Sequence, residues 1–483
     1  MLSSWTPESC ESGNMQAHEL SNLFDPKTIA VVGASSDLTK PGARLMAYCL
    51  KLGAPVKLFP INPNRPEVMG KKAFSRVTEV PDDIDVVCVA VPRQAVQTVV
   101  EDCVTKKAKF IVVFSAGFSE IGNREQQTKL VQTAKNAGCR IMGPNCQGLI
   151  STVNNVILSY HSCLDTTPVR GKIALVTQSG ALGGYLTGAF WERKIGISHF
   201  VSTGNESDLE VSEFVKFLVT DSNTKVITLF LEGIRNGPKF RQAAEEAVRA
   251  KKPIIVVKTG KSEKGRQSAL THTGAMTGSD KVYDALFKQL GILRVKTMEE
   301  LIEGAAALAS QPLPTGNRIA FISPSGAACS LVSDVCDDLG LKVADLSGKT
   351  LARVKSLLPE MAVAKNPLDV VYVYGNPNAR TMIGDLIEAM ATDPNVDMVI
   401  PGLTIGGTVA NEVAAYCLES IRKVREKTSK PVLFWWATDR DSFARAESLF
   451  SKNEVPLYTT PERAVTAAAI MFEYADYLQR RTK

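Results

Sequence analysis

The 483-residue sequence lacks any apolar run near the roughly 18–20 residues that a membrane-spanning helix needs. Its start has no apolar signal-peptide core and carries acidic residues instead, so residues 1–22 are expected to form a disordered leader. The ten cysteines form neither a CxxC pair nor a Cys/His zinc spacing, which argues against a metal site. The net charge of +6 is small and dispersed, so neither nucleic acid nor a membrane is expected as a partner. We therefore expect a globular cytoplasmic protein with reduced, buried thiols.

Short apolar runs rich in β-branched residues recur along the chain, and most are closely followed by Gly, Ser or Pro. Such runs are typical of parallel strands that helices cover on both faces. The segments between them have helical patterns, as in residues 239–250 and 379–391. This alternation predicts doubly wound α/β sheets, which bind ligands at the carboxyl ends of their strands. Eight runs are expected to be buried strands: 29–32, 85–89, 110–114, 173–176, 226–231, 254–257, 319–322 and 398–400.

Two breaks in the pattern divide the chain into three expected domains, which span residues 23–151, 169–311 and 317–483. An irregular stretch precedes the second domain, and a Pro/Gly-rich linker precedes the third. The second and third domains both open with a strand and a Ser-Gly turn, at Ser179 and at Ser325. This parallel indicates a weak structural repeat.

The first domain places small or polar residues directly after five expected strands. The first strand runs into a turn from Gly33 to Ser36, where backbone N–H groups and the following helix suit a phosphate. The full GxGxxG motif is absent, so nucleotide-like binding and a plain tight turn both remain open there. Together, the five turns favour an edge that binds a cofactor with phosphates and a long extended arm. The other four turns are Ile61-Asn62-Pro63, Val91-Pro92, Ser115-Ala116-Gly117 and Gly143-Pro144-Asn145-Cys146-Gln147-Gly148.

Histidine is scarce, and His272 differs from the other three residues of its type. Residues 270–279 around it form a polar loop of small residues ahead of an expected helix. A histidine that accepts a phosphoryl group needs a neutral imidazole, exposure and a mobile loop. On composition alone, an ordinary surface histidine in a loop is the commoner explanation. The others are expected to be leader, structural or surface residues: His18, His161 and His199.

Two positions in the second domain are candidates for work on a phosphoryl group. Ser179 and Gly180 lie where a helix is expected to start, and the helix dipole favours an anion there. The alternative is an ordinary turn that Ser179 caps. Glu232 closes the strand 226–231, where a carboxylate can accept an imidazole N–H and fix the tautomer. A capping or surface glutamate is the alternative for this position.

Taken in order, these motifs resemble the α subunit of the NDP-forming acyl-CoA synthetases, the superfamily that includes succinyl-CoA ligase. The resemblance covers residue 23 to the C-terminus and is greater to the α part of the ADP-forming acetate–CoA ligases, since the succinyl-CoA ligase α subunit is shorter. It rests on seven stretches in register: Val32-Gly33-Ala34-Ser35, Ile61-Asn62-Pro63, Gly143-Pro144-Asn145-Cys146-Gln147-Gly148, Gln178-Ser179-Gly180-Ala181-Leu182, Ser202-Thr203-Gly204-Asn205-Glu206, Leu231-Glu232-Gly233 and His272-Thr273-Gly274-Ala275.

The resemblance implies an α/β fold with an N-terminal Rossmann-like CoA-binding domain, followed by two flavodoxin-like CoA-ligase domains. It implies that His272 is the phosphohistidine and that Glu232 holds it. It also implies that Ser179 and Gly180 start the helix that stabilises the phosphate. The residues that match the CoA site are Gly33, Ser35, Ser36, Asn62 and Pro92.

The implied reaction interconverts a carboxylic acid, CoA and ATP with acyl-CoA, ADP and phosphate. An acyl phosphate forms on the enzyme, its phosphoryl group moves to His272, and the loop then swings to a nucleotide site. No length remains for the ATP-grasp module that forms this site in the family. A separate β subunit is therefore expected, and it is expected to provide the main part of the binding site for ATP or ADP with Mg²⁺. We expect the subunits to form a hetero-oligomer with α–α or α–β contacts. The small carboxylic acid stays open, from acetate to aryl acids and larger dicarboxylates.

Two alternative functions share this scaffold. One is a different acyl-CoA or CoA-transfer enzyme, although the absence of an appended synthase domain argues against a citrate-lyase-like cleavage. The other is a catalytically inactive, CoA-binding regulatory protein. The presence of both His272 and Glu232 argues against it, because a degenerate relative would be free to lose them.

Overall fold

The computed structural model describes residues 20–267, 279–371, 379–406 and 409–482. Most of the expected leader and the loop with His272 therefore lie outside the described residues. The chain divides into two compact units, and each is described by itself. Unit 1 comprises residues up to 192 and 196–294, and unit 2 comprises residues 193–195 and 295–483. All eight apolar runs that the sequence singles out form strands.

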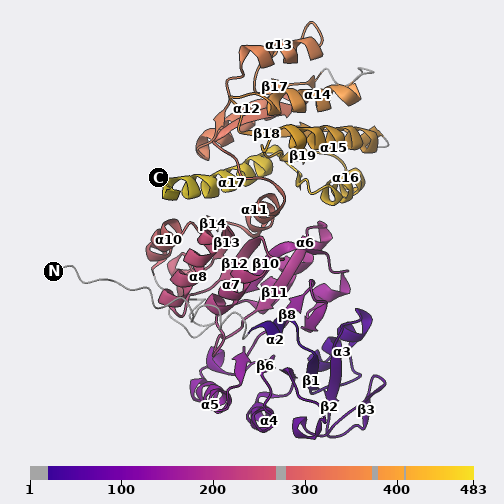
Figure 1. Cartoon of the computed structure of the whole chain (residues 1–483), viewed down its shortest axis with the longest axis vertical. Coiled ribbons are helices and arrows are strands. Elements are labelled where there is room, and N and C mark those ends of the chain that lie inside the picture. Colours follow the sequence, from indigo (N-terminus) through magenta and orange to yellow (C-terminus); the bar gives the residue numbers. More distant parts are fainter. Residues whose placement is uncertain (1–19, 268–278, 372–378, 407–408, 483) are drawn as a thin grey trace, which may run out of the picture. The chain divides into compact units, whose positions relative to one another are not determined.

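The first sheet of unit 1 contains five parallel strands in the order β2-β1-β5-β6-β7 (Figure 1). Because all five strands are parallel, the five turns that follow them lie along one edge of the sheet. Their bounds are β1 Thr28–Val32, β2 Lys57–Ile61, β5 Val86–Val89, β6 Phe110–Val113 and β7 Arg140–Met142.

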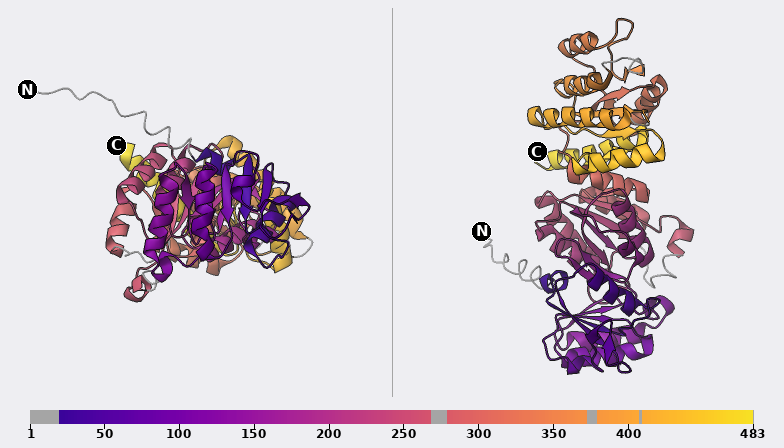
Figure 2. Two further views of the ribbon diagram at one scale, coloured as in Figure 1. Left: turned by 90° about the horizontal axis from the view of Figure 1, so that it is seen from below. Right: turned by 90° about the vertical axis from the view of Figure 1, so that its right-hand side faces the viewer.

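Helices pack against this sheet (Figure 2). The apolar side chains of its strands are buried. The helices α4 (Arg93–Thr105) and α5 (Arg124–Lys135) pack on each other and share one core with residues of every strand from β1 to β7 in this sheet. The helix α3 (Pro41–Lys51) packs against β1 and against β9 of the second sheet. The first sheet is thus held in place by its own helices and by the neighbouring sheet.

The second sheet of unit 1 has seven strands in the order β14-β13-β12-β10-β11-β8-β9 (Figure 1). The strands β10 to β13 are parallel, whereas β8 is antiparallel to β11. The expected boundary at residue 151 assigns β8 to the first domain, but its backbone pairs with the second sheet. The bounds are β8 Gly148–Ser151, β9 Val156–Leu158, β10 Arg170–Thr177, β11 Ile197–Ser202, β12 Val226–Leu231, β13 Ile254–Lys258 and β14 Leu293–Val295.

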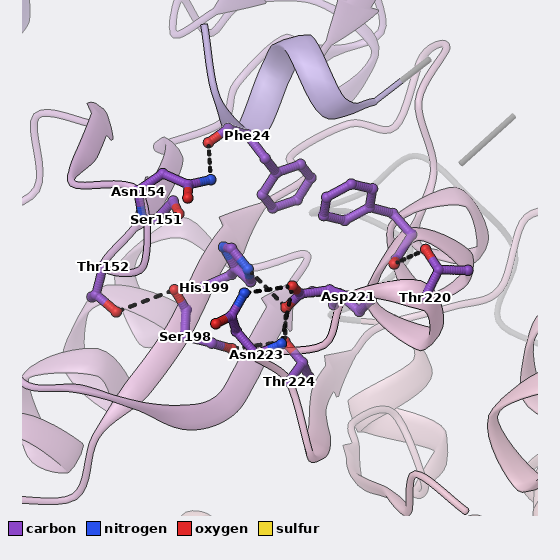
Figure 3. Close-up of polar contacts among 12 residues, drawn as sticks. Phe24, Ser151, Thr152, Asn154, Ser198, His199, Thr220, Asp221, Asn223 and Thr224 are labelled. Atoms are coloured by element: carbon purple, nitrogen blue, oxygen red, sulfur yellow. Dashed lines mark hydrogen bonds and ion pairs between the residues drawn. The ribbon is translucent and has the colours of Figure 1, made fainter. Parts of the chain in front are cut away.

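In the described residues, helices follow the parallel strands β10 to β13 of the second sheet along the chain. Their bounds are α6 Gly180–Glu192, α7 Val211–Thr220, α8 Gly237–Arg249 and α10 Asp280–Gln289. The short helix α2 (Ser21–Phe24) also packs on this part of the chain, although the expected leader extends to residue 22. Phe24 stacks on Phe217 of α7. Its ring also makes a T-shaped contact with the ring of His199 (Figure 3). His199 is buried, and its Nε2 lies 3.1 Å from a carboxylate oxygen of Asp221.

Unit 2 contains a parallel sheet in the order β16-β15-β18-β19-β20, with β17 also paired to β15. The helix α12 packs on α17, and α14 packs on α13 and α15. The strand bounds are β15 Arg318–Ser323, β16 Lys342–Val343, β17 Leu368–Asp369, β18 Met398–Leu403, β19 Phe434–Trp436 and β20 Leu457–Tyr458. The helix bounds are α11 Met298–Ser310, α12 Gly326–Asp338, α13 Gly348–Leu357, α14 Ala379–Ala391, α15 Val409–Lys427, α16 Arg440–Lys452 and α17 Pro461–Thr482.

Every cysteine in the described ranges is buried and free. Among the helices of those ranges, none combines the length and the apolar character that crossing a membrane requires.

Candidate functional site

The turn after β1 is built by close backbone packing. Gly33 has a φ of +83°, and a Cβ at this position would lie 2.4 Å from the carbonyl oxygen of Ala90. Glycine is therefore required where the end of β1 approaches the end of β5. Ser35 is buried, and its Oγ accepts a hydrogen bond from the Asp37 N–H at 3.1 Å. Ser36 is exposed, so its hydroxyl is available to a ligand at this edge.

Two further predicted residues follow neighbouring strands at the same edge. Asn62 follows β2, and its side-chain amide donates to the carbonyl oxygen of Ala34 at 2.8 Å. This bond ties the end of β2 to the turn after β1. Pro92 follows β5 and is the N-cap residue of α4. The structure thus brings the predicted CoA-site residues to adjacent carboxyl ends of one parallel sheet. Ser36 and Lys40, in the segment after β1, are exposed. Their hydroxyl and ammonium groups could bind the phosphate of a ligand such as CoA.

The second sheet presents the start of α6 at the carboxyl end of β10. Ser179 lies between β10 and α6, and its N–H donates to the Thr177 hydroxyl at 3.1 Å. α6 begins at Gly180, where the backbone N–H groups of the first turn have no partner within the helix. A Cβ at Gly180 would lie 2.7 Å from Cγ of Gln147, a residue of the first domain's last turn. The helix start therefore touches the expected CoA-binding domain and is suited to an anion.

Glu232 and Lys258 occupy the ends of the adjacent strands β12 and β13. Both residues are buried, with exposed fractions of 9% and 2%. The Lys258 ammonium lies 4.4 Å from the centroid of the Tyr283 ring. Burial lowers the pKa of Lys258 to about 8, and the charge of Arg294 acts in the same direction, whereas Asp280 and Glu232 oppose it. Glu232 is thus largely shielded from solvent and close enough to the buried Lys258 to act on its pKa.

Gln178 and Glu206 contact the candidate residue Glu232 or its neighbours at this sheet edge, and the sequence analysis did not single them out. Gln178 follows β10, and its side-chain oxygen accepts hydrogen bonds from the N–H of Glu232 at 2.6 Å and of Gly233 at 3.0 Å. Its NH₂ donates to the carbonyl oxygen of Gly233 at 2.8 Å and to the Glu206 carboxyl at 2.9 Å. The only sequence signal was that both residues stand in strand-end turns among the seven matching stretches.

His272 lies in residues 268–278, outside the described residues. β13 ends at Lys258 and α10 begins at Asp280, so His272 belongs to the connection between these two elements. Two other histidines have structural contacts. His161 accepts a hydrogen bond at Nδ1 from the Cys163 N–H at 3.0 Å, and His199 is paired with an aspartate.

Two family models match parts of the chain. Residues 27–152 match the family model described as a CoA binding domain. Residues 170–308 match the model described as a succinyl-CoA ligase like flavodoxin domain.

Two relatives and one solved structure resemble nearly the whole chain. The alpha subunit of ADP-forming acetate–CoA ligase II from Pyrococcus furiosus is 36% identical over 94% of this chain and 98% of its own length. The ADP-forming 4-hydroxybutyrate–CoA ligase from Nitrosopumilus maritimus is 32% identical over 95% of this chain and 65% of its own length. The dinucleotide-forming acetyl-coenzyme A synthetase 1 of Candidatus Korarchaeum cryptofilum, in complex with phosphate and ADP, gives a TM-score of 0.87 at 34% identity. That match covers 96% of this chain and 99% of the other.

This chain is more than 30% identical to an alpha subunit over almost that subunit's full length, and a solved relative has the same fold. Such similarity shows membership of one family and not only a shared fold. The chain belongs to the family of NDP-forming acid–CoA ligase alpha subunits, enzymes that join a carboxylic acid to the thiol of CoA.

Proposed function

We propose that His272 carries a phosphoryl group between the CoA-binding half of the enzyme and a nucleotide site on a partner subunit. In the direction of ATP synthesis, phosphate attacks the acyl-CoA carbonyl, which forms an acyl phosphate and releases CoA. A ring nitrogen of His272 then attacks the phosphorus, and the carboxylic acid leaves. ADP finally takes the phosphoryl group from His272. Each step reverses in the direction of acyl-CoA synthesis.

The observation that carries this proposal is the placement of Glu232 beside the start of α6. β10 and β12 are adjacent parallel strands, and the Gln178 N–H after β10 bonds to the carbonyl oxygen of Phe230 in β12 at 3.2 Å. A carboxylate and a helix start therefore share one edge of one sheet. In this arrangement Glu232 accepts one imidazole N–H of His272 and leaves the other nitrogen as the nucleophile.

The start of α6 stabilises the negative charge of the phosphoryl group. Ser179 and Gly180 place backbone N–H groups and the positive end of the helix dipole at the edge that Glu232 also reaches. These groups stabilise phosphate charge without a change of protonation. The chain thus contributes positioning and charge stabilisation, which account for most of the catalysis in phosphoryl transfer.

CoA is proposed to bind along the first sheet. Gly33, Ser35, Ser36, Asn62 and Pro92 lie at the carboxyl ends of adjacent parallel strands, where such sheets bind ligands. CoA supplies the thiol that carries the acyl group. The contact between Gln147 and the start of α6 supports delivery of that thiol to the phosphate site, because the two sheets meet there.

The partner is proposed to be an ATP-grasp subunit that binds ATP or ADP with Mg²⁺. The boundaries 23–151, 169–311 and 317–483 remain our proposed domain limits for this α subunit. We also propose a cytoplasmic location, because the cysteines of the described ranges are free thiols. The relatives are named for acetate and for 4-hydroxybutyrate, so the acid of this chain must be found by assay.

The test is to purify the chain together with an ATP-grasp subunit and to measure ADP formation from ATP, CoA and a panel of acids. His272→Ala should lower the rate about a thousandfold or more and abolish acid-labile phosphate labelling. His18→Ala, in the leader, is the matched control and should retain full activity. Full ligase activity or persistent labelling in His272→Ala would refute the proposal. CoA binding without turnover of any acid would instead favour a regulatory protein.

A further inference from the structure

The Gln178 side chain connects the ends of three neighbouring strands. It follows the central strand β10, bonds to Glu232 and Gly233 after β12 on one side, and bonds to Glu206 after β11 on the other. Its orientation follows from its partners. The two N–H groups need the amide oxygen, whereas the Gly233 carbonyl and the Glu206 carboxyl need the NH₂. Among the side chains, only an amide supplies an acceptor and two donors in one plane.

These contacts fix the backbone on both sides of the Glu232 Cα. The N–H of Glu232 belongs to the peptide before this Cα, and the N–H of Gly233 belongs to the peptide after it. Both N–H groups bond to the same oxygen of Gln178. When both flanking peptide planes are held, the direction of the Cα–Cβ bond is held as well. The next residue, Ile234, is also anchored, because its N–H donates to the Tyr283 hydroxyl at 3.3 Å.

Glu206 in turn holds Gln178. Its side chain is 1% exposed, and one carboxyl oxygen accepts from the Thr203 hydroxyl at 2.9 Å and from the Val211 N–H at 3.1 Å. The other oxygen accepts from Gln178 and lies 3.8 Å from Nε of Arg235. Glu206 has a φ of +50°, a conformation that is uncommon for residues other than glycine. Three hydrogen bonds to one buried carboxyl group therefore maintain an unfavourable backbone geometry.

We infer that Gln178, held by Glu206, is a positioning residue that aims the Glu232 carboxyl group at the phosphoryl-carrying histidine. This inference rests on the proposed role of Glu232 and adds the residues that make it effective. Catalysis by a carboxylate depends on its placement to within a fraction of an ångström. Gln178 contributes to that placement by holding the backbone from which the Glu232 side chain extends. Its loss should affect the phosphoryl transfer that Glu232 assists and should leave transfer at the nucleotide site unchanged.

The experiment uses the complex with the ATP-grasp subunit and measures two rates by rapid quench. The first is labelling of the chain by [γ-³²P]ATP with Mg²⁺. The second is discharge of the labelled protein by CoA and the panel acid with the highest wild-type rate. Gln178→Met should slow discharge at saturating CoA by about tenfold or more, the scale of one or more lost hydrogen bonds. Labelling by ATP and the KM for CoA should stay within about twofold, because neither depends on the Glu232 carboxyl.

Glu206→Gln should give a smaller slowing of discharge, since Gln178 keeps its bonds to Glu232 and Gly233. Gln311→Met is the matched control. Gln311 is a buried glutamine that also bridges backbone groups, at Val432 N–H and the Glu454 carbonyl. Both of its rates should stay within about twofold of the wild-type rates, because Gln311 lies in unit 2.

Glu232→Gln separates failure of this inference from failure of the proposed function. Normal discharge in Glu232→Gln would refute the catalytic role of Glu232 and the inference with it. Slow discharge in Glu232→Gln but normal discharge in Gln178→Met would refute the positioning role alone. Equal slowing of labelling and discharge in Gln178→Met would also refute it, because it would mark Gln178 as a general structural residue.

Discussion

At the residue scale, Glu206 is a carboxyl group placed where water does not reach it. Burial raises its pKa to about 7, although the Gln178 amide, the charge of Arg235 and the Thr203 hydroxyl oppose this change. The nearby Glu210 acts in the same direction as burial. The ionised form of Glu206 is therefore less stable in the folded protein than in the unfolded chain.

The raised pKa of Glu206 predicts how the stability of the complete chain changes between pH 4.5 and 7. In this window the folded protein retains the Glu206 proton, whereas the unfolded chain has lost it. The free energy of unfolding should therefore fall as pH rises, by up to about 1.4 kcal/mol per pH unit from this group. Glu206→Gln removes the titration. Thermal unfolding of both proteins at several pH values should show that the variant loses less stability than the wild type across this window. Parallel pH profiles would contradict the prediction.

The candidate residues differ in how clearly the sequence alone marks them. Gly33 and Glu232 stand directly after apolar runs, and Ser179 stands in the turn after another, so the pattern itself marks them as strand-end residues. Glu206 carries no such mark, because it lies four residues beyond the end of β11. Its burial and its bond to Gln178 arise only when the loop folds back over the end of β10.

At the element scale, the helix α2 anchors the start of the described chain to the second sheet. Phe24 is 1% exposed, and its ring centroid lies 4.0 Å from that of Phe217 with nearly parallel planes. The backbone oxygen of Phe24 accepts a hydrogen bond from Asn154 at 3.1 Å (Figure 3). β1 begins only four residues later, at Thr28, so the anchor lies beside the entry to the first sheet.

Removal of the Phe24 ring should destabilise unit 1 substantially. Phe24→Ala leaves a cavity against Phe217 and should lower the free energy of unfolding by about 3–5 kcal/mol, as measured by urea denaturation. Leu50→Ala is the matched control, because Leu50 is 44% exposed and its truncation should change stability by less than about 0.5 kcal/mol. Equal effects of the two substitutions would show that α2 is not an anchor.

Strand periodicity predicted the elements of the interior better than those at the edges. β12 spans Val226–Leu231, as the apolar run indicates, because it is buried between other strands. The short strands β8 and β9, the last two strands at one side of the second sheet, match no comparable run in the sequence analysis. They are strands because β8 pairs with β11, which is remote in sequence, and that pairing assigns them to the second sheet.

At the scale of the whole molecule, units 1 and 2 repeat one local design. After β10, Thr177 Oγ1 donates to the Ser179 carbonyl and accepts from the Ser179 N–H. After β15, Ser323 Oγ makes the same two bonds with Ser325. In each unit a helix begins at the following glycine. The repeat that the sequence indicated weakly is therefore a repeat of hydrogen-bonded turns as well as of residue types.

The two sheets of unit 1 are joined by a buried ion pair. Asp208 is 1% exposed at its side chain and accepts hydrogen bonds from Arg140 at 3.0 Å and from the Ile141 N–H at 2.9 Å. Arg140 and Ile141 belong to β7 of the first sheet, and Asp208 precedes α7 of the second. Burial raises the pKa of Asp208, but the bonds from Arg140 and Ile141 more than offset this and hold the pKa below its ordinary value.

The ion pair of Asp208 and Arg140 should stabilise unit 1 at neutral pH, and this stabilisation should be lost in acid. A lowered carboxyl pKa contributes stability above the unfolded pKa of about 3.9, and this stability is lost as pH falls through the folded value. Asp208→Asn should lower the free energy of unfolding by about 1.5–3 kcal/mol at pH 7, because Arg140, Lys135 and the Ile141 N–H lose a charged acceptor. Arg140 keeps its second partner, Glu213. The deficit should shrink as the wild-type carboxylate is protonated. Urea denaturation from pH 7 to pH 3 measures this convergence.

Asp82→Asn serves as the control for the ion pair. Asp82 pairs with Lys57 at 2.6 Å on the surface, where the Lys57 side chain is 70% exposed. Such a pair contributes at most about 1 kcal/mol. A pH-independent deficit in Asp208→Asn, or a loss no larger than that of Asp82→Asn, would contradict the assigned role of Asp208.

The sequence by itself determined the α/β class, the strand-end turns and the family, because apolar periodicity and short motifs are local properties of the chain. It also singled out Glu232 and the start of α6 as separate candidates. Only the tertiary structure decided that these two features share one sheet edge, since strand order is set by packing between residues far apart in sequence. The same applies to Gln178 and Glu206. Their bonds join segments 28 and more residues apart, and no local pattern encodes such contacts.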